Sequence, residues 1–173
     1  MRPLYRLRQF WKAVFPCVRE RERDWVRAAL PPRAGEVFFS MSPAGQRHAI
    51  DTARRLAAWE KHIRSRLSAA EYRDLLQAAL LHDCGKIPFR LTVGQRAARV
   101  LLKASPLPLS PRALRRCPYV GKALEAAAVH ADLGAETAAR CGLSLEAQTL
   151  IARHHQTPRT PAESLLAQAD DCS

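Results

Sequence analysis

Apolar residues along the chain recur at spacings of three and four, which is the period of one face of a helix. Residues 2–18 place Leu, Val and Trp on one such face among Arg and Lys, which predicts a basic amphipathic helix. That helix has three readings: contact with a membrane surface, binding of a partner, or packing on its own domain. A second helix is predicted over 19–30 and stops at Pro31-Pro32.

Helix-start signals mark the middle of the chain. Ser42-Pro43 combines a capping residue with Pro at the first helical position, and the helix it opens is expected to run to about Arg66. Ser68 and Glu71 form a capping box that opens the next helix. No β-strand pattern is present, so we predict an all-α bundle of about six to nine helices.

The helix after this capping box is strongly apolar and leads into His82-Asp83, where Gly85 and Pro88 end it. The proline-containing segment 92–122 is interpreted as a lid or an insertion over the site. Further helices are predicted over 92–104, 119–129, 132–141 (stopped by Gly142) and 145–155, with a last one from Pro161 to Asp170-Asp171.

Length and composition set the broad class. A chain of 173 residues is long enough for one domain with a real core, and we divide it into 1–41, basic N-terminal helices, and 42–173, the main domain. No apolar run reaches the about 20 residues that a membrane span needs, and no signal peptide is visible. The 5 cysteines are scattered and are expected to be reduced. We therefore expect a cytoplasmic protein.

Charge is unevenly distributed. Lys and Arg total 28 against 16 Asp and Glu, a net charge of +12, and no acidic residue stands between Asp83 and Glu125. Such a field favours phosphate-bearing partners, although codon bias toward Arg is an alternative explanation. A nucleic-acid partner is ranked last, because the chain has no basic platform interleaved with aromatic residues.

The 6 histidines carry most of the candidate chemistry. Only His62 sits in a charged, surface-like context, whereas the other histidines neighbour small apolar residues at expected helix positions. Imidazole and carboxylate together suit divalent Mn, Fe, Co, Ni or Zn. A lone His on an apolar face is usually a core residue, but five in one small domain favour a metal site.

The run Leu80-Leu81-His82-Asp83-Cys84-Gly85-Lys86 resembles the central motif of the HD-domain superfamily of metal-dependent phosphohydrolases, in its HDIG-like branch. The resemblance extends over residues 42–171. Its other matching positions are His48, the extra His130 before a Gly-Ala helix, the pair His154-His155 and the closing Asp170, for which Asp171 is a less favoured substitute.

This resemblance implies an HD-type helical bundle holding one or two divalent ions (Mn, Fe, Co, Ni, Zn or Mg). By analogy, the first ion is bound by His48, His82, Asp83 and Asp170, and the second by His130, His154 and His155, with Asp83 as the bridge. Asp83 and Lys86 are the implied catalytic residues. Lys86, and more weakly Arg47 and Arg153, are the expected phosphate contacts.

The resemblance implies hydrolysis of a phosphate ester or anhydride, in a nucleotide or signalling nucleotide. Cyclic di-GMP is disfavoured, because His154-His155 is followed by Gln156-Thr157 and not by an acidic residue and the Gly-Tyr-Pro element of the enzymes that cleave it. The alternative is a module that keeps the fold as a nucleotide sensor or scaffold without catalysis. The oligomeric state is left open.

Overall fold

The computed structural model describes residues 17–92, 94–95 and 118–172, and within these ranges it contains helices and no strand. The prediction of an all-α bundle is therefore confirmed. No helix among the described residues is long and apolar enough to span a bilayer. In chain order the elements are α2 (Glu20–Ala29), α3 (Pro32–Ser40), α4 (Pro43–Ala58), α5 (Glu60–Ile63), α6 (Ala69–Leu81), the 3-10 helix η1 (Cys84–Phe89), α9 (Pro118–Arg140), α10 (Leu145–Arg153) and α11 (Pro161–Asp171).

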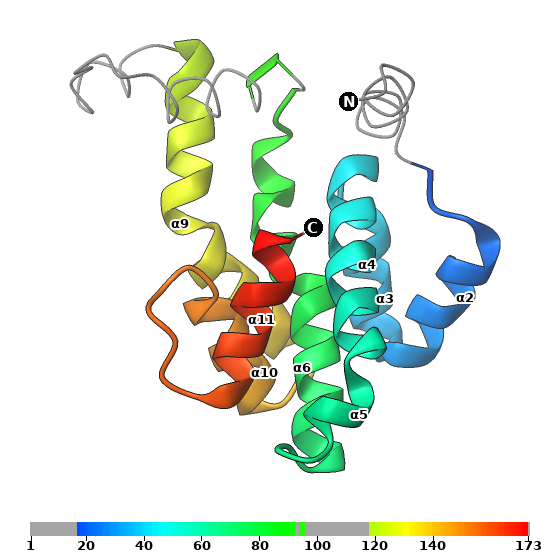
Figure 1. The fold of residues 1–173 in the computed structure, drawn as a ribbon. Coiled ribbons are helices and arrows are strands. Elements are labelled where there is room, and N and C mark those ends of the chain that lie inside the picture. The colour runs from blue at the N-terminus through cyan, green and yellow to red at the C-terminus, as the bar shows by residue number, and fades with distance from the viewer. Residues whose placement is uncertain (1–16, 93, 96–117, 173) are drawn as a thin grey trace, which may run out of the picture.

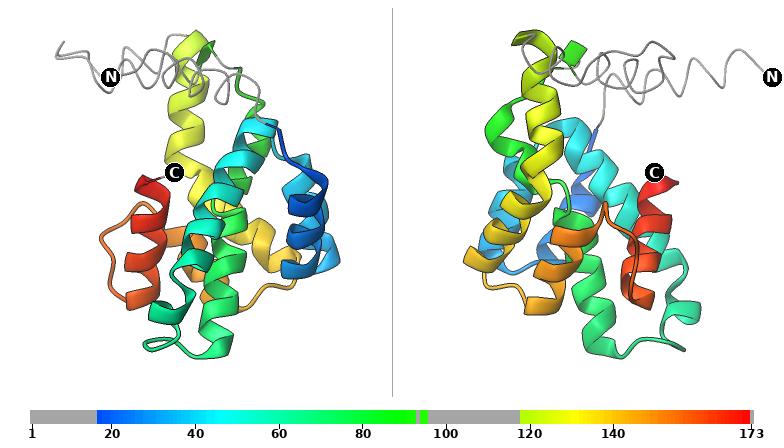
Figure 2. Two further views of the ribbon diagram at one scale, coloured as in Figure 1. Left: turned by 45° about the vertical axis from the view of Figure 1, so that its right-hand side comes forward. Right: turned by 90° about the vertical axis from the view of Figure 1, so that its left-hand side faces the viewer.

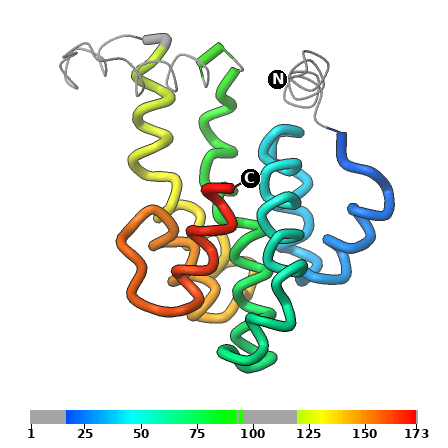
Figure 3. Tube along the Cα trace, viewed as in Figure 1, coloured from blue at the N-terminus to red at the C-terminus, as the bar shows by residue number. Residues whose placement is uncertain are grey.

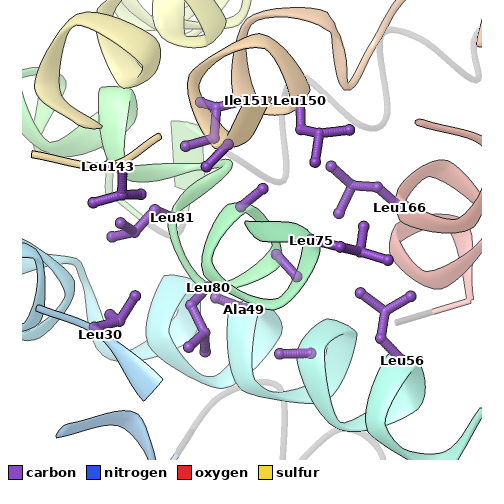
Figure 4. Packing of buried hydrophobic residues seen from close by; sticks show 14 of the residues in the cluster. Leu30, Ala49, Leu56, Leu75, Leu80, Leu81, Leu143, Leu150, Ile151 and Leu166 are labelled. Carbon is purple, nitrogen blue, oxygen red and sulfur yellow. The ribbon is translucent and has the colours of Figure 1, made fainter. Parts of the chain in front are cut away.

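Helix α6 is the centre of the bundle. It buries residues around its whole circumference, which is the pattern of a core helix. Helices α2, α3, α4, α10 and α11 all contact it. In Figure 4, Leu75 and Leu80 of α6 face different neighbours, with Leu56 and Ala49 of α4 below and Leu166 of α11 beside them. Because α6 is held on all sides, the residues at its C-terminal end are placed firmly inside the protein.

The long helix α9 runs beside η1, the segment that follows α6 (Figures 1 and 2). Helix α10 packs on both α9 and α6, and α11 returns the chain to α4 and α6, as the tube in Figure 3 shows. The ends of α6, α10 and α11 and the middle of α9 are thereby brought together. These positions carry most of the predicted ligands.

Several predicted helix boundaries are confirmed. The Ser42 hydroxyl accepts a hydrogen bond from the Gly45 amide, and Ser68 and Glu71 form the reciprocal capping box at 3.3 and 2.8 Å. Helix α9 ends before Gly142, whose φ of +77° is the left-handed conformation expected at that position. Helices 19–30 and 161–171 also lie as expected.

One helix, α3, was missed, and two other predictions of helix extent were wrong. Pro31-Pro32 stops α2, but Pro32 then takes the first position of α3, where a missing amide costs nothing. The helix expected from Pro43 to Arg66 breaks at Trp59, with no Gly or Pro to signal it. The two helices expected over 119–129 and 132–141 are one helix, α9.

Two predictions lie mainly outside the described residues. The basic helix of 2–18 precedes the described chain except for its last two positions, and Cys17 and Val18 are not helical. Of the expected lid over 92–122, the structure describes only Thr92, residues 94–95 and the start of α9. Both remain predictions.

Helix α2 is tied to α4 by the buried carboxylate of Glu22. Glu22 accepts hydrogen bonds from Arg47 Nη1 at 2.8 and 2.9 Å and from the Arg19 amide at 2.8 Å, and it pairs with Arg54 Nη1 at 2.6 Å. Burial alone would raise the pKa of Glu22, but these donors outweigh it and lower that pKa. Arg47 precedes His48 in α4, so this contact also braces the start of the predicted site.

We expect Glu22→Gln to lower the free energy of unfolding by about 2 kcal/mol, since a buried charged hydrogen-bond partner is lost. The effect should shrink as pH falls. A carboxylate whose pKa is lowered by folding stabilises the folded state at pH values above its unfolded-state pKa, and this stabilisation is lost as pH falls through its folded-state pKa. Urea unfolding of the variant at several pH values measures both. The exposed Glu36→Gln is the control, and equal curves for the two variants would contradict the role of Glu22.

Candidate metal centre

Five helix segments each bring a predicted ligand to one place inside the bundle. His48 lies in α4, and His82 and Asp83 form the turn between α6 and η1. His130 lies in the middle of α9, and His154 and His155 directly follow α10. Asp170 is in the last turn of α11. These residues span 123 positions of sequence, and the fold gathers all of them.

The three buried histidines are oriented in the same way. Nδ1 of His82 lies 2.9 Å from the Ala79 carbonyl, Nδ1 of His130 lies 2.9 Å from that of Ala126, and Nδ1 of His154 lies 2.7 Å from that of Ile151. A carbonyl oxygen only accepts, so each Nδ1 must carry the hydrogen. Each Nε2 therefore turns its lone pair inward, which is how metal-binding histidines are held by their outer partners.

The first cluster consists of His48, His82 and Asp170. Asp170 Oδ1 lies 2.8 Å from His48 Nε2 and 3.4 Å from His82 Nε2, and the two imidazole nitrogens lie 3.3 Å apart. All three ligand atoms fall within 4.8 Å of one another, close enough to bind one ion. The neighbouring Asp171 is exposed and belongs to neither cluster, so the geometry favours Asp170 as the closing ligand.

The second cluster consists of His130, His154 and His155. Their ligand atoms also lie within 4.8 Å of one another, and His130 Nε2 is 3.1 Å from His155 Nε2. His130 and His154 are buried, whereas His155 is exposed. The two clusters adjoin, because the ring centroids of His82 and His154 are only 5.1 Å apart.

Asp83 stands between the clusters. Its Oδ1 lies 3.8 Å from Nε2 of His82 in the first cluster, and 3.6 and 4.0 Å from Nε2 of His130 and His154 in the second. Oδ1 also forms an ion pair with Lys86 Nζ at 2.5 Å. One carboxylate oxygen therefore faces ligands of both clusters.

Two buried polar atoms at the centre of the site are not fully satisfied by protein groups alone. His154 Nε2 is a buried side-chain atom with no hydrogen-bond partner, and the buried Asp83 Oδ1 has the ion pair with Lys86 as its one close cationic contact among the described residues. Leaving a buried acceptor such as His154 Nε2 unpaired is costly, and Asp83 Oδ1 lies only 4.0 Å from it. A divalent cation would satisfy them, and the imidazole and carboxylate donors suit transition metals. The residues present therefore fit the metal that the sequence predicts.

The electrostatics agree with a cation site. Burial lowers the pKa of His154 to about 3 and that of His130 to about 4, so both rings are neutral at pH 7. Burial would raise the pKa of Asp83 and Asp170, but it is outweighed by His82 and Lys86 beside Asp83 and by the hydrogen bonds of Asp170 with His48 and His82. Both pKa values are held below the ordinary range. For His82 the carboxylates of Asp83 and Asp170 overcome burial and raise the pKa. Because its Nδ1 is already bonded to Ala79, the favoured proton would occupy Nε2, where a cation would bind.

The predicted phosphate contacts differ in their surroundings. Lys86 lies beside Asp83 and lines a pocket of about 500 Å³ together with His48. Arg47 instead bonds to Glu22 and Asp51, and Arg153 bonds to Glu163 at 2.8 Å. These pairs give both arginines a structural role. Their phosphate contact remains a prediction.

Other features of the site were not anticipated from the sequence. Gly85 packs so closely on α9 that an added Cβ would lie 2.0 Å from the His130 carbonyl oxygen and 2.7 Å from the Gly134 amide. The pocket wall formed by Ala123, Ala126 and Ala127 was also missed. The alanine run one turn before His130 is a sequence signal for such a wall, visible only once the helix is placed.

The family model for the HD domain matches residues 45–173, well over half of the chain. No curated protein and no solved structure matches the chain. The match contains every residue of the two clusters and Asp83. HD domains bind divalent metals and are in general metal-dependent phosphohydrolases, and this chain belongs to the HD-domain family.

Proposed function

We propose that the protein hydrolyses a phosphate ester or anhydride, with a nucleotide or signalling nucleotide as substrate, using two divalent ions. The observation that carries this proposal is the position of Asp83 Oδ1 between two clusters of ligands, beside a pocket. Two-metal sites of phosphohydrolases have ions about 3.5–4 Å apart, and a bridging carboxylate is a natural way to hold them.

The residues divide between two ions in this proposal. His48, His82 and Asp170 would hold the first, while His130, His154 and His155 would hold the second, and Asp83 would be shared. When bound, the ions supply charge stabilisation and a water activated at neutral pH. The hydrogen bonds from Nδ1 to backbone carbonyls keep three of the rings in place, so the ligands need little rearrangement on binding.

Lys86 is assigned to the phosphate. Its ammonium group is at the mouth of the site, with the side chain 31% exposed, and in this structure it pairs with Asp83. With cations bound at Asp83 that pairing would weaken, and the ammonium could then contact a phosphoryl oxygen as a point charge. Because Lys86 also lines the pocket, it can reach substrate from the ligand side.

We expect two Mn²⁺ per chain in protein reconstituted with excess metal and then dialysed. The seven candidate ligands exceed what one ion needs, and they form two groups. Elemental analysis gives the stoichiometry, and anomalous scattering from Mn-grown crystals should give two peaks. His130→Ala should keep one ion, while the exposed His62→Ala, a control, should keep both. A single peak in the unmodified protein would make the site mononuclear.

Turnover separates an enzyme from a nucleotide sensor or scaffold. We expect hydrolysis of at least one compound in a nucleotide panel assayed with Mn, Co, Ni and Mg. Product release that depends on added metal and disappears with a chelator supports the proposal. Metal-dependent nucleotide binding without product, under every metal tested, would instead support the non-catalytic module.

A further inference from the structure

The pocket beside the ligands is walled mainly by apolar groups. Its volume of about 500 Å³ lies within the range of small-molecule sites, which is roughly 300–1,000 Å³. One wall comes from α9 and exposes only the small side chains of Ala123, Ala126 and Ala127. Met41 and Ile87 add larger apolar surface. Since His48, Asp83 and Lys86 line the same pocket, a ligand there lies against the metal centre.

The α9 wall is also rigidly connected to the ligands. The carbonyl groups of Ala126 and Ala127 accept the Nδ1 hydrogen of His130, at 2.9 and 3.1 Å. The residues that limit the pocket are therefore the ones that orient a ligand of the second cluster. Larger side chains on this wall would fill the pocket, so its alanines determine what can enter.

Arg90 lines the same pocket and has an unusual backbone. Its φ of 43° is left-handed, and it is the one non-glycine residue with positive φ in the described ranges. This conformation is unfavourable for any residue with a Cβ, and glycine would adopt it freely. The Arg90 side chain is exposed and forms no ion pair with a described residue. Arg90 ends η1, where a left-handed residue is common. As an exposed arginine at a pocket edge, with no acidic partner among the described residues, it is a candidate for ligand binding.

We propose that this pocket binds the organic body of the substrate, and that Arg90 binds a second anionic group carried by that body. The substrate class is then a phosphate compound with an apolar part of nucleoside size and a further phosphate beyond the one that is attacked. This inference rests on the proposed function, because it takes the metal centre as the place of the attacked phosphate. Specificity is assigned to the alanine wall and to Arg90, whereas Lys86 serves the attacked group.

The pocket assignment is tested by placing a larger side chain at an alanine of α9 that lines the pocket. Ala127→Leu puts a larger side chain into it, and Ala128→Leu makes the same change at the exposed next residue, outside the lining. Calorimetry on Mn-loaded protein uses α,β-methylene diphosphates of adenosine, guanosine, cytidine and uridine. We expect Ala127→Leu to weaken the best of these at least about tenfold and Ala128→Leu to change it less than about twofold. Ala44→Leu, on the α4 wall, repeats the test if Ala127→Leu does not fold.

The role of Arg90 is tested by comparing the affinity for a nucleoside monophosphate with that for the matching diphosphate analogue. We expect Arg90→Gln to weaken the diphosphate analogue about tenfold or more and the matching monophosphate less than about twofold, with Arg90→Lys retaining most of the affinity. Arg90→Gly should melt no lower than the unmodified protein, since it relieves the backbone, yet it should lose the same affinity. A melting temperature that falls sharply in Arg90→Gly would show that the side chain stabilises the fold.

Each part of the proposal can fail separately. It is overturned if the protein binds none of the four diphosphates, if Ala127→Leu and Ala128→Leu behave alike, or if Arg90→Gln weakens mono- and diphosphate equally. Binding that responds to these variants without turnover of any nucleotide would refute hydrolysis and keep the pocket assignment. Turnover that is unchanged by the substitutions at Ala127 and Arg90 would support hydrolysis and refute the pocket assignment.

Discussion

Asp83→Asn should abolish tight binding of both ions and lower kcat by about 10³-fold or more. Its Oδ1 faces His82 of the first cluster and His130 and His154 of the second, so both sites lose a charged ligand in one change. Metal ions contribute several kcal/mol of transition-state stabilisation, and each 1.36 kcal/mol is a factor of ten in rate. The substitution nearly preserves shape, so the bundle should remain folded.

Metal content after dialysis and kcat with the best substrate measure this prediction. Asp171→Asn is the matched control: it makes the same chemical change at an exposed position next to the ligand Asp170. Asp170→Asn should be intermediate, since Asp170 contacts only His48 and His82. Unchanged metal content in Asp83→Asn would place the metal elsewhere. Loss of metal in Asp171→Asn would identify Asp171, in place of Asp170, as the closing ligand.

The candidate ligands could be named from the sequence because they stand in short motifs that resemble those of the HD family. His82-Asp83 follows an apolar helix, His130 precedes a Gly-Ala segment, and His154 and His155 are adjacent, so each stands out along the chain. The helix caps at Ser42 and Ser68 were readable for the same reason. What sequence alone could not provide was distance: nothing local shows that a single oxygen of Asp83 faces both clusters.

The errors have a common physical origin in tertiary contacts. The structural role of Arg47 was missed in the same way, because the carboxylate that it binds, Glu22, lies in another helix; its phosphate contact stays a prediction. The end of α4 at Trp59 has no local breaker, and the α5 residue that follows it into the core, Ile63, is fully buried. Arg90 looked like one of many arginines, and only its backbone conformation distinguishes it.

The close contact of η1 with α9 depends on Gly85. The Gly85 backbone lies against the His130 carbonyl and the Gly134 amide, and η1 and α9 are in extensive contact. A methyl group there would meet backbone atoms, which cannot rotate away as a side chain could. Asp83 adjoins η1 and His130 lies in α9. The distance between these two helices therefore determines how far the shared carboxylate lies from the second cluster.

Gly85→Ala should therefore destabilise the fold and open the metal centre. We expect a loss of about 3 kcal/mol or more, which for a chain of this size lowers the melting temperature by about 6–12 °C. The second ion should be bound more weakly than the first, because α9 and its His130 must move away from Asp83. Gly35→Ala is the control, since a Cβ at that helix position meets no atom within 4 Å. It should leave metal content unchanged and gain about 0.5–1 kcal/mol, as alanine favours the helix. Equal melting temperatures for the two variants would show that η1 can shift without cost, and that Gly85 does not set the spacing of the metal centre.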